Sequence, residues 1–381
     1  MIRNALLLDP EARSPEPGSL LIEGGRIAAR LGAGESVAAD ARAVDLGGRR
    51  LAPGFIDLHF HGALAFRGAE GFAEALNDAG ENLLRHGTTA FLATTLAWPA
   101  PEVAVCVSRL ASLLDGRSAR AAAPIGIHLE GPWIHPGAAG AQPRHAIRPF
   151  ERSEGEEVLE RGEGWVRMVT LAPEIEGAAA LQAALERRGI AIALGHSLAR
   201  AEQVQDAVER GARHVTHLFN AMGPLHHRAP GLAGVALGDD RLTCDLICDG
   251  VHVDPAMVRV AARAKGERLI LITDRVEAPE GESLGFGSGP LHDDGTAIRM
   301  ADGRLAGSHL TLDRALGLAQ EFAGLELLEA VAACTLRPAR VLGVESERGT
   351  LRPGARADFA VLDAAGSVVE TWVDGQRAWS E

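Results

Sequence analysis

Short apolar runs with the composition of β-strands alternate with longer amphipathic stretches over most of this chain. Eight such runs cover residues 51–61, 88–96, 124–130, 166–172, 190–196, 214–220, 242–248 and 269–274. Helical patterns lie between them, for example at 71–85, 101–114, 178–188, 201–210 and 255–264. This alternation is typical of a parallel sheet whose strands are connected by helices. Eight units predict an α/β fold, a (β/α)8 TIM barrel, whose functional side chains lie at the carboxyl ends of the strands.

The two ends of the chain have a different pattern, with short strands divided by turn residues. Predicted strands cover residues 5–8, 19–23, 26–29, 357–362 and 367–373. We expect residues 1–50 and 343–381 to form one small β-sandwich domain beside a catalytic barrel of residues 51–342. The Gly- and Asp-rich segment 279–306 predicts a hairpin inserted after the last barrel strand. A chain of 381 residues is long enough for both units.

The charge balance argues against a polyanionic partner. The formal net charge is -13 and basic residues form no cluster, so we do not expect nucleic-acid binding. The first 30 residues lack a secretory signal pattern, and no run is long and apolar enough to cross a bilayer. We therefore expect a cytoplasmic protein without a membrane partner. An anionic small substrate would have to be bound by individual arginines.

Histidines occupy one face of the first predicted barrel strand. Residues 55–61 alternate with period two, so Asp57, His59 and His61 share the inward face. Two imidazoles on one strand face can bind a single cation, and the alternative is a pair of hydrogen-bonded core histidines. Asp57 lies deeper in the barrel, where we expect it to orient a histidine rather than to bind metal.

Three further candidate ligands end other predicted strands. Glu130 ends the third strand, with His128 on the same face. A buried glutamate is costly unless it is paired, protonated or bound to metal. His196 and His217 close the fifth and sixth strands. Together with Glu130 they make up the three protein ligands of a catalytic zinc, which leaves a fourth position for water.

Candidate catalytic and anion-binding groups follow the later strands. Asp274 ends the eighth strand, where a carboxylate can take a proton from water and return it to a leaving amine, although strand-capping aspartates are also common. His252 follows the seventh strand and can polarise a carbonyl oxygen. Arg228, in the loop after the sixth strand, can bind phosphate or carboxylate through a forked hydrogen-bond pair.

Several longer motifs are similar to those of a known family. They lie at 52–57, 128–133 (HLEGPW), 195–197, 216–222 (THLFNAM), 226–234 (HHRAPGLAG), 249–254, 273–274 and 349–351. In this order, and over nearly the whole chain, they resemble the N-acetylglucosamine-6-phosphate deacetylases of the amidohydrolase superfamily. The segments 216–222 and 226–234 are specific to this family rather than to the superfamily.

The resemblance implies a reaction and roles for the motif residues. The reaction would be hydrolysis of the acetamide of a 6-phosphorylated amino sugar, which yields acetate and the free amine. Glu130, His196 and His217 would bind the principal metal. Asp274 would be the acid and base, and His252 would contact acetamide or sugar oxygens.

The same resemblance implies the substrate contacts and the assembly. Asn220 and Ala221 would bind the sugar phosphate, and Arg228 would reach it from the partner subunit of a homodimer. Many members carry a histidine that contacts sugar near position 142, where this chain has Gln142, and we expect Gln142 to contact the substrate in its place.

The metal count depends on the first-strand histidines. Some members of the family replace them and keep one metal, whereas this chain has both His59 and His61. Related hydrolases often bridge two metals with a carbamylated lysine, but the single lysine, Lys265, lies in a helical pattern. Glu130 is therefore the bridging candidate. We expect one or two divalent ions per subunit, with zinc as the first expectation and iron or another ion as the alternative.

The chain departs from the family pattern at 63–67, at Gln142 and at 275–277. These departures leave three readings open. The first is deacetylation of N-acetylglucosamine 6-phosphate. The second is deacylation of another N-acyl amino sugar phosphate, such as the galactosamine epimer, or of an unphosphorylated N-acyl compound whose carboxylate Arg275 would bind. The third is an inactive barrel that binds sugar phosphate or metal, against which the intact Asp274 argues.

Overall fold

The computed structural model describes residues 1–381 except 33–34, 36–42, 116–120, 278–284 and 287–288. Among these residues, eight parallel strands follow one another around a barrel in chain order. They are β6 (Phe55–Gly62), β7 (Thr88–Thr94), β8 (Ala123–Glu130), β9 (Val166–Leu171), β10 (Ala191–Leu194), β11 (His214–Val215), β12 (Thr243–Ile247) and β13 (Leu269–Ile272). The predicted (β/α)8 barrel is confirmed.

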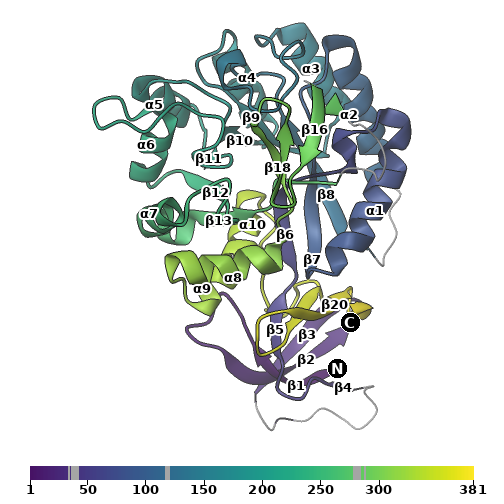
Figure 1. The fold of residues 1–381 in the computed structure, drawn as a ribbon. Coiled ribbons are helices and arrows are strands. Elements are labelled where there is room, and N and C mark those ends of the chain that lie inside the picture. Colours follow the sequence, from purple (N-terminus) through teal and green to yellow (C-terminus); the bar gives the residue numbers. More distant parts are fainter. Residues whose placement is uncertain (33–34, 36–42, 116–120, 278–284, 287–288) are drawn as a thin grey trace.

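Helices cover the outside of the barrel (Figure 1). They are α1 (Phe72–Leu84), α2 (Ala100–Leu114), α3 (Arg152–Arg161), α4 (Ala178–Arg187), α5 (Ala201–Glu209), α6 (Gly231–Gly238), α7 (Pro255–Lys265), α8 (Leu312–Ala323), α9 (Leu327–Cys334) and α10 (Leu336–Val341). Their apolar faces and the outward strand residues share one buried core. No helix in the described part of the chain combines the length and apolarity needed to span a bilayer.

The barrel closes between its last and first strands. After β13 the chain continues as β14 (Arg275–Val276), which pairs in parallel with β6. The Asp274 N–H donates to the His59 carbonyl at 2.9 Å, and the Thr273 hydroxyl donates to Asp57 Oδ2 at 2.6 Å. Asp57 also accepts the backbone N–H of His59 at 3.2 Å. Asp57 therefore orients the His59 backbone, and it links the two strands that carry candidate ligands.

Strands from both termini build the second unit, the expected β-sandwich, which carries both chain ends in Figure 1. They are β1 (Ile2–Leu7), β2 (Glu16–Glu23), β3 (Arg26–Gly32), β4 (Val44–Asp45), β5 (Arg50–Pro53), β19 (Phe359–Leu362), β20 (Val368–Val373) and β21 (Gln376–Ser380). Residues from both ends share a separate apolar core that includes Leu7, Leu20, Phe359 and Trp372.

An antiparallel ribbon follows the last barrel strand. Its strands are β15 (Gly285–Phe286), β16 (Gly289–Asp293), β17 (Ala297–Met300) and β18 (Leu305–Ser308). The inserted hairpin predicted at 279–306 therefore has more than two strands, and its residues 279–284 and 287–288 lie outside the described residues. Strand β18 pairs in parallel with β14, which attaches the ribbon to the barrel rim.

Two local predictions were wrong. The run 51–61 is not one strand, because β5 pairs with β1 and β19 in the sheet of the termini and β6 enters the barrel after Gly54. His214, predicted to point away from the barrel axis, lies buried against Asp245 with Nε2 2.9 Å from Oδ2. The prediction extrapolated strand alternation from His217, but His217 has a φ of 33° and breaks that alternation.

Candidate active site

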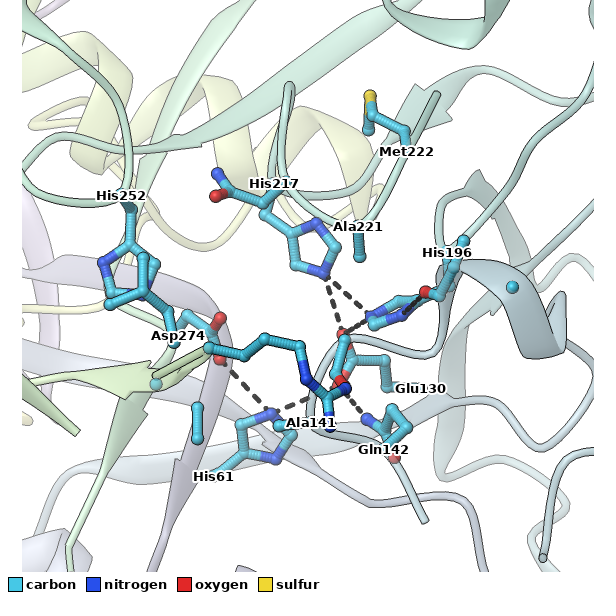
Figure 2. A pocket seen from close by; sticks show the side chains of 18 of the residues that line it. His61, Glu130, Ala141, Gln142, His196, His217, Ala221, Met222, His252 and Asp274 are labelled. Atoms are coloured by element: carbon cyan, nitrogen blue, oxygen red, sulfur yellow. Dashed lines mark hydrogen bonds and ion pairs between the residues drawn. The ribbon is translucent and has the colours of Figure 1, made fainter. Parts of the chain in front are cut away.

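Three strand ends bring one carboxylate and two imidazoles together. Glu130 Oε1 lies 2.9 Å from His196 Nε2 and 3.0 Å from His217 Nε2. The two Nε2 atoms are 3.1 Å apart. All three side chains are buried, and Figure 2 shows them converging from β8 and from the ends of β10 and β11. The sequence placed these residues on separate strands, and the barrel brings their ligand atoms into mutual contact.

The backbone at these strand ends is held in an uncommon conformation. His196, His217 and Asp274 have positive φ values of 47°, 33° and 48°. Non-glycine residues rarely adopt this region, and when they do they cluster at functional sites. His196 Nδ1 also donates to the Ala138 carbonyl at 2.8 Å, which turns its Nε2 toward Glu130. The local backbone therefore aims these side chains at one point.

A second cluster lies against the other oxygen of the same glutamate. His61 Nε2 is 3.2 Å from Glu130 Oε2, 3.3 Å from Asp274 Oδ1 and 3.2 Å from His59 Nε2. His59 Nε2 lies 3.4 Å from Glu130 Oε1. His61 Nδ1 donates to the Thr94 carbonyl at 3.2 Å, which leaves its Nε2 directed at the cluster. Glu130 therefore stands between two groups of donors, as a bridging carboxylate would.

The donor set fits divalent cations. Tetrahedral N and O ligands held about 2.0–2.1 Å from one ion lie roughly 3.3 Å from each other. The separations among Glu130, His196 and His217 are 2.9 to 3.1 Å, slightly closer than that. His59, His61 and Asp274 also offer ligand atoms close enough for an ion. One or two divalent ions can be held by side chains that are already in place.

The pKa values in the cluster are set by opposite charges that compensate for the cost of burial. Although burial opposes it, hydrogen bonds to Asp274 and Glu130 raise the pKa of His61 to about 10. Burial likewise opposes the charge on His217, whose contact with Glu130 raises its pKa to about 9. Burial disfavours the Glu130 carboxylate, yet the neighbouring histidines, His59 first, hold its pKa well below the usual range.

Asp274 is an ionised carboxylate beside this cluster. Burial alone would raise its pKa, but His59 and His61 lower it to about 2. A base must be unprotonated before it can accept a proton, and Asp274 is unprotonated at neutral pH. Its Oδ1 lies 3.5 Å from His59 Nε2 and 3.3 Å from His61 Nε2.

A cavity of about 370 Å³ opens over the cluster. Its lining includes the predicted residues His61, Glu130, Gln142, His196, His217, Asn220, Ala221, His252 and Asp274. The Nδ2 atom of Asn220 and the Nε2 atom of His252 are buried and have no hydrogen-bond partner among the described residues. Buried polar atoms of this kind are costly unless a ligand or water satisfies them. Both are therefore available to a substrate.

His252 is held in place by a nearby carboxylate. Its Nδ1 lies 2.6 Å from Asp249 Oδ2, and its backbone N–H donates to Asp249 Oδ1 at 2.7 Å. Burial raises the pKa of Asp249, but the hydrogen bond from His252 more than offsets this and the pKa is lowered. With Nδ1 bound to Asp249, the free Nε2 of His252 is available on the lining of the cavity. The sequence motif 249–254 contains both members of this pair.

Gln142 contacts a metal-ligand candidate directly. Its Nε2 donates to Glu130 Oε2 at 2.6 Å, and its Oε1 accepts the Ala97 N–H at 2.8 Å. The side chain is 3% exposed, and it also lines the cavity. Figure 2 shows it beside Glu130 on the side away from His217. The sequence predicted a substrate contact here and missed this bond to the glutamate.

The arginine that lines the cavity is not the one that the sequence predicted. Arg228 is exposed and its Nη1 donates to His227 Nε2 at 2.9 Å, and it is absent from the described lining of this chain's cavity. Arg304, at the turn before β18, is the single arginine among the described lining residues. Its Nε donates to Asp302 Oδ2 at 2.7 Å and its Nη1 donates to the Gly140 carbonyl. The sequence of the turn before β18 did not indicate that Arg304 would line the cavity.

Two of the three departures from the family pattern lie beside this cavity. Arg275 and Arg67 line a neighbouring cavity of about 430 Å³. Arg275 Nε donates to Glu277 Oε1 at 3.1 Å, and Arg67 Nη1 pairs with Glu74. The segments 63–67 and 275–277 are absent from the described lining of the cavity over the cluster. The side chains around the donor cluster are therefore separate from these two departures.

Comparisons with known proteins agree with this geometry. The model of the amidohydrolase family matches residues 50–378. The N-acetylglucosamine-6-phosphate deacetylase of Homo sapiens is 37% identical, with 94% of this chain and 91% of the relative covered. The N-acetylgalactosamine-6-phosphate deacetylase of Escherichia coli O157:H7 is 35% identical over 86% of this chain and 87% of the relative.

A solved structure gives the same result in three dimensions. It is a mutant N-acetyl-D-glucosamine-6-phosphate deacetylase from Mycobacterium smegmatis in complex with N-acetyl-D-glucosamine-6-phosphate. The TM-score is 0.89 at 33% identity, with 99% of this chain and 98% of that chain covered. The barrel and its donor cluster define a hydrolase whose clustered side chains could bind a divalent metal. The chain belongs to the amidohydrolase family, and the resemblance to the deacetylases found in its sequence is confirmed.

Proposed function

We propose that this protein hydrolyses the acetamide of N-acetylglucosamine 6-phosphate to glucosamine 6-phosphate and acetate. The observation that carries the proposal is the meeting of Glu130, His196, His217 and Asp274 in one cavity. Relatives that share 33–37% of their residues with this chain are named for this activity. The reaction class matches the donors present, since amide hydrolysis needs a polarised carbonyl, an activated water and a proton donor for the amine.

Divalent metal would be held in the first place by Glu130, His196 and His217. His59 and His61 would hold a second ion, with Glu130 between the two. When bound, the metal supplies Lewis-acid polarisation and lowers the pKa of water. Zinc is our first expectation for His and Glu ligands, with iron or another divalent ion as the alternative.

The chain's own residues would move the proton. Asp274, ionised at neutral pH, takes a proton from the attacking water as the carbon–oxygen bond forms. It then gives this proton to the amine nitrogen as the carbon–nitrogen bond breaks, which releases acetate and the free amine. His252, through its free Nε2, would contact an acetamide or sugar oxygen.

Recognition of the phosphate would use residues from more than one segment. Asn220 and Ala221 line the cavity, and the Asn220 Nδ2 group is free to donate. Arg304 would add charge from the same chain. Arg228 would reach the phosphate from the partner subunit of a homodimer, which accounts for its place outside this chain's own cavity. We place the enzyme in the cytoplasm, where phosphorylated sugars are metabolised.

N-acetylgalactosamine 6-phosphate is a second candidate substrate. A relative with 35% identity is named for that activity. The two sugars differ in the configuration of one hydroxyl group, and a site built to bind a hydroxyl can reject the wrong epimer strongly. The same cluster would catalyse either reaction.

Acetate release tests the proposed function. Metal-loaded protein is assayed with N-acetylglucosamine 6-phosphate, its galactosamine epimer and unphosphorylated N-acetylglucosamine, and metal content is measured in parallel. We expect the highest kcat/KM for the first sugar and one or two ions per chain. Preference for the epimer would replace the substrate within the proposal. No acetate release from any of the three sugars by metal-loaded protein would overturn the proposed function.

A further inference from the structure

A second and larger cavity lies at the opposite end of the barrel. Its volume is about 740 Å³, and its lining comes from the amino ends of strands β9 to β13 together with α10 and the residues after it. Ala191, His214 and Thr243 are first residues of their strands and line it. The donor cluster, by contrast, lies at the carboxyl ends of the strands. The two cavities are therefore separated by the length of the barrel.

Arginine is concentrated in this second cavity. Its lining contains Arg167, Arg213, Arg241, Arg268, Arg337 and Arg340. Two carboxylates, Glu186 and Glu267, line it with them. The chain as a whole carries a formal charge of -13, so this concentration opposes the overall balance. A field of one sign inside a cavity attracts ligands of the other sign.

Four of these arginines lack a carboxylate partner among the described residues. Arg241 pairs with Asp239 and Glu209, and Arg268 pairs with Asp240. The remaining arginines form no ion pair with any carboxylate of the described residues; they are Arg167, Arg213, Arg337 and Arg340. Their positive charges are therefore not neutralised at close range.

Backbone carbonyls hold three of the four in position. Arg337 Nη1 donates to the Leu269 carbonyl at 2.9 Å, and Arg167 Nη2 donates to the Leu342 carbonyl at 2.7 Å. Arg213 Nη1 donates to the Val208 carbonyl at 2.6 Å. A carbonyl fixes the direction of a guanidinium without cancelling its charge. The cavity therefore presents fixed donors to a ligand at no further ordering cost.

Burial makes the lack of an anion costly at the cavity floor. Arg337 is 7% exposed, while Arg213 and Arg340 are exposed at the rim. Burial lowers the pKa of Arg337, and the more distant Glu329 and Glu267 only partly oppose it. A buried charge without a counter-charge destabilises a fold, and an anion that enters the cavity would relieve this.

We propose that this arginine-lined cavity binds a small organic phosphate that carries at least two phosphoryl groups. Guanidinium forks match phosphate oxygens in geometry and charge. A volume of about 740 Å³ lies within the roughly 300–1,000 Å³ of known ligand sites and exceeds that of the catalytic cavity. Several separated arginines favour a ligand with more than one anionic group. The proposal does not depend on the identity of the substrate hydrolysed at the other end of the barrel.

Calorimetric titration of the metal-loaded, full-length protein with fructose 1,6-bisphosphate tests the proposal. We expect saturable binding that weakens about tenfold in Arg340→Ala, because one charge-assisted fork is lost. Arg340 is exposed, so this variant should fold, and its melting temperature without ligand is measured as a check. Arg85→Ala, which removes an exposed arginine outside both cavities, should bind like the parent protein.

The catalytic cavity is a competing location for the probe. Arg304→Ala removes the arginine of the catalytic cavity. If the probe bound there, its affinity would be lower for Arg304→Ala, and its affinity for Arg340→Ala would equal that for the parent protein. We expect the reverse pattern. The proposal is overturned if the parent protein shows no binding, or if Arg340→Ala binds as tightly as Arg85→Ala.

Discussion

At the carboxyl ends of the barrel strands, buried carboxylates and imidazoles lie against one another, whereas at the amino ends arginines, of which Arg337 is buried, lie against backbone carbonyls. In the first region each charge is matched, and the pKa shifts of His61 and Asp274 reflect this match. In the second region the pKa of Arg337 falls because burial is not compensated. A matched cluster is organised to hold a cation, and an unmatched one of positive sign favours an anion.

Removal of the proposed proton carrier should have the largest effect. Asp274→Asn keeps the size of the side chain but cannot accept a proton, and general acid–base groups contribute about 10²–10⁴-fold to rate. We expect kcat to fall by roughly 10³-fold or more while metal content stays close to that of the parent. Turnover is measured by acetate release and metal by elemental analysis. Unchanged turnover would remove Asp274 from the mechanism.

Loss of the bond between Gln142 and Glu130 should affect metal binding next. Outer groups that orient metal ligands typically change affinity or activity about 10–100-fold. We expect Gln142→Leu to weaken metal affinity by about tenfold, with a smaller loss of kcat once metal is saturating. Competition with a chelator measures the affinity. If only KM for the sugar rises, Gln142 contacts substrate and does not position Glu130.

The ligand candidates could be predicted because they end strands. Period-two alternation places His59 and His61 on one face, and the carboxyl ends of barrel strands converge, which groups Glu130 and His196 with them. The pattern failed at His214, since the positive φ of His217 interrupts the alternation on which the prediction relied. A residue's backbone conformation at a functional turn is set by tertiary contacts, which the sequence pattern does not contain.

Residues that reach the cavities from loops were harder to predict. Gln142 contacts Glu130 from a loop, and Arg304 reaches Gly140 across 164 positions of the chain. Neither lies in a periodic segment, so no pattern connects it to the cluster. The arginines of the second cavity come from the amino ends of several strands and from α10. Their sequence separation concealed the group, so the sequence predicted no basic cluster.

Arginine variants should separate the two routes to the phosphate. We expect Arg304→Ala to raise KM for the phosphorylated sugar about tenfold, roughly the contribution of one charge-assisted contact, with little change for the unphosphorylated sugar. Arg228→Ala is the matched variant from outside this chain's cavity. A similar KM effect there, together with a dimer in solution, would support a contribution from the partner subunit. Equal effects on both sugars would assign Arg304 a structural role.

The smallest expected effect is on the free energy of unfolding after substitution of the buried arginine of the second cavity. This variant tests whether the two ends of the barrel differ in how they stabilise buried charge. Arg337→Leu removes a buried charge that has no carboxylate partner in the described part of the chain, and it also removes one hydrogen bond to the Leu269 carbonyl. Loss of the charge relieves a burial penalty, while the lost bond costs about 1 kcal/mol, so the two largely offset each other. In phosphate-free buffer we expect the free energy of unfolding to change by no more than about 1 kcal/mol.

Urea unfolding measures this change in the free energy of unfolding. The measurement is repeated in the presence of fructose 1,6-bisphosphate. A ligand that binds the folded state alone raises stability in proportion to its saturation of the site. We therefore expect the sugar bisphosphate to stabilise the parent protein more than Arg337→Leu. A loss of several kcal/mol without ligand would show that Arg337 is matched by the fold, as His61 is matched by Asp274. The two ends of the barrel would then treat buried charge in the same way, and the cavity would be a structural feature of the closed barrel.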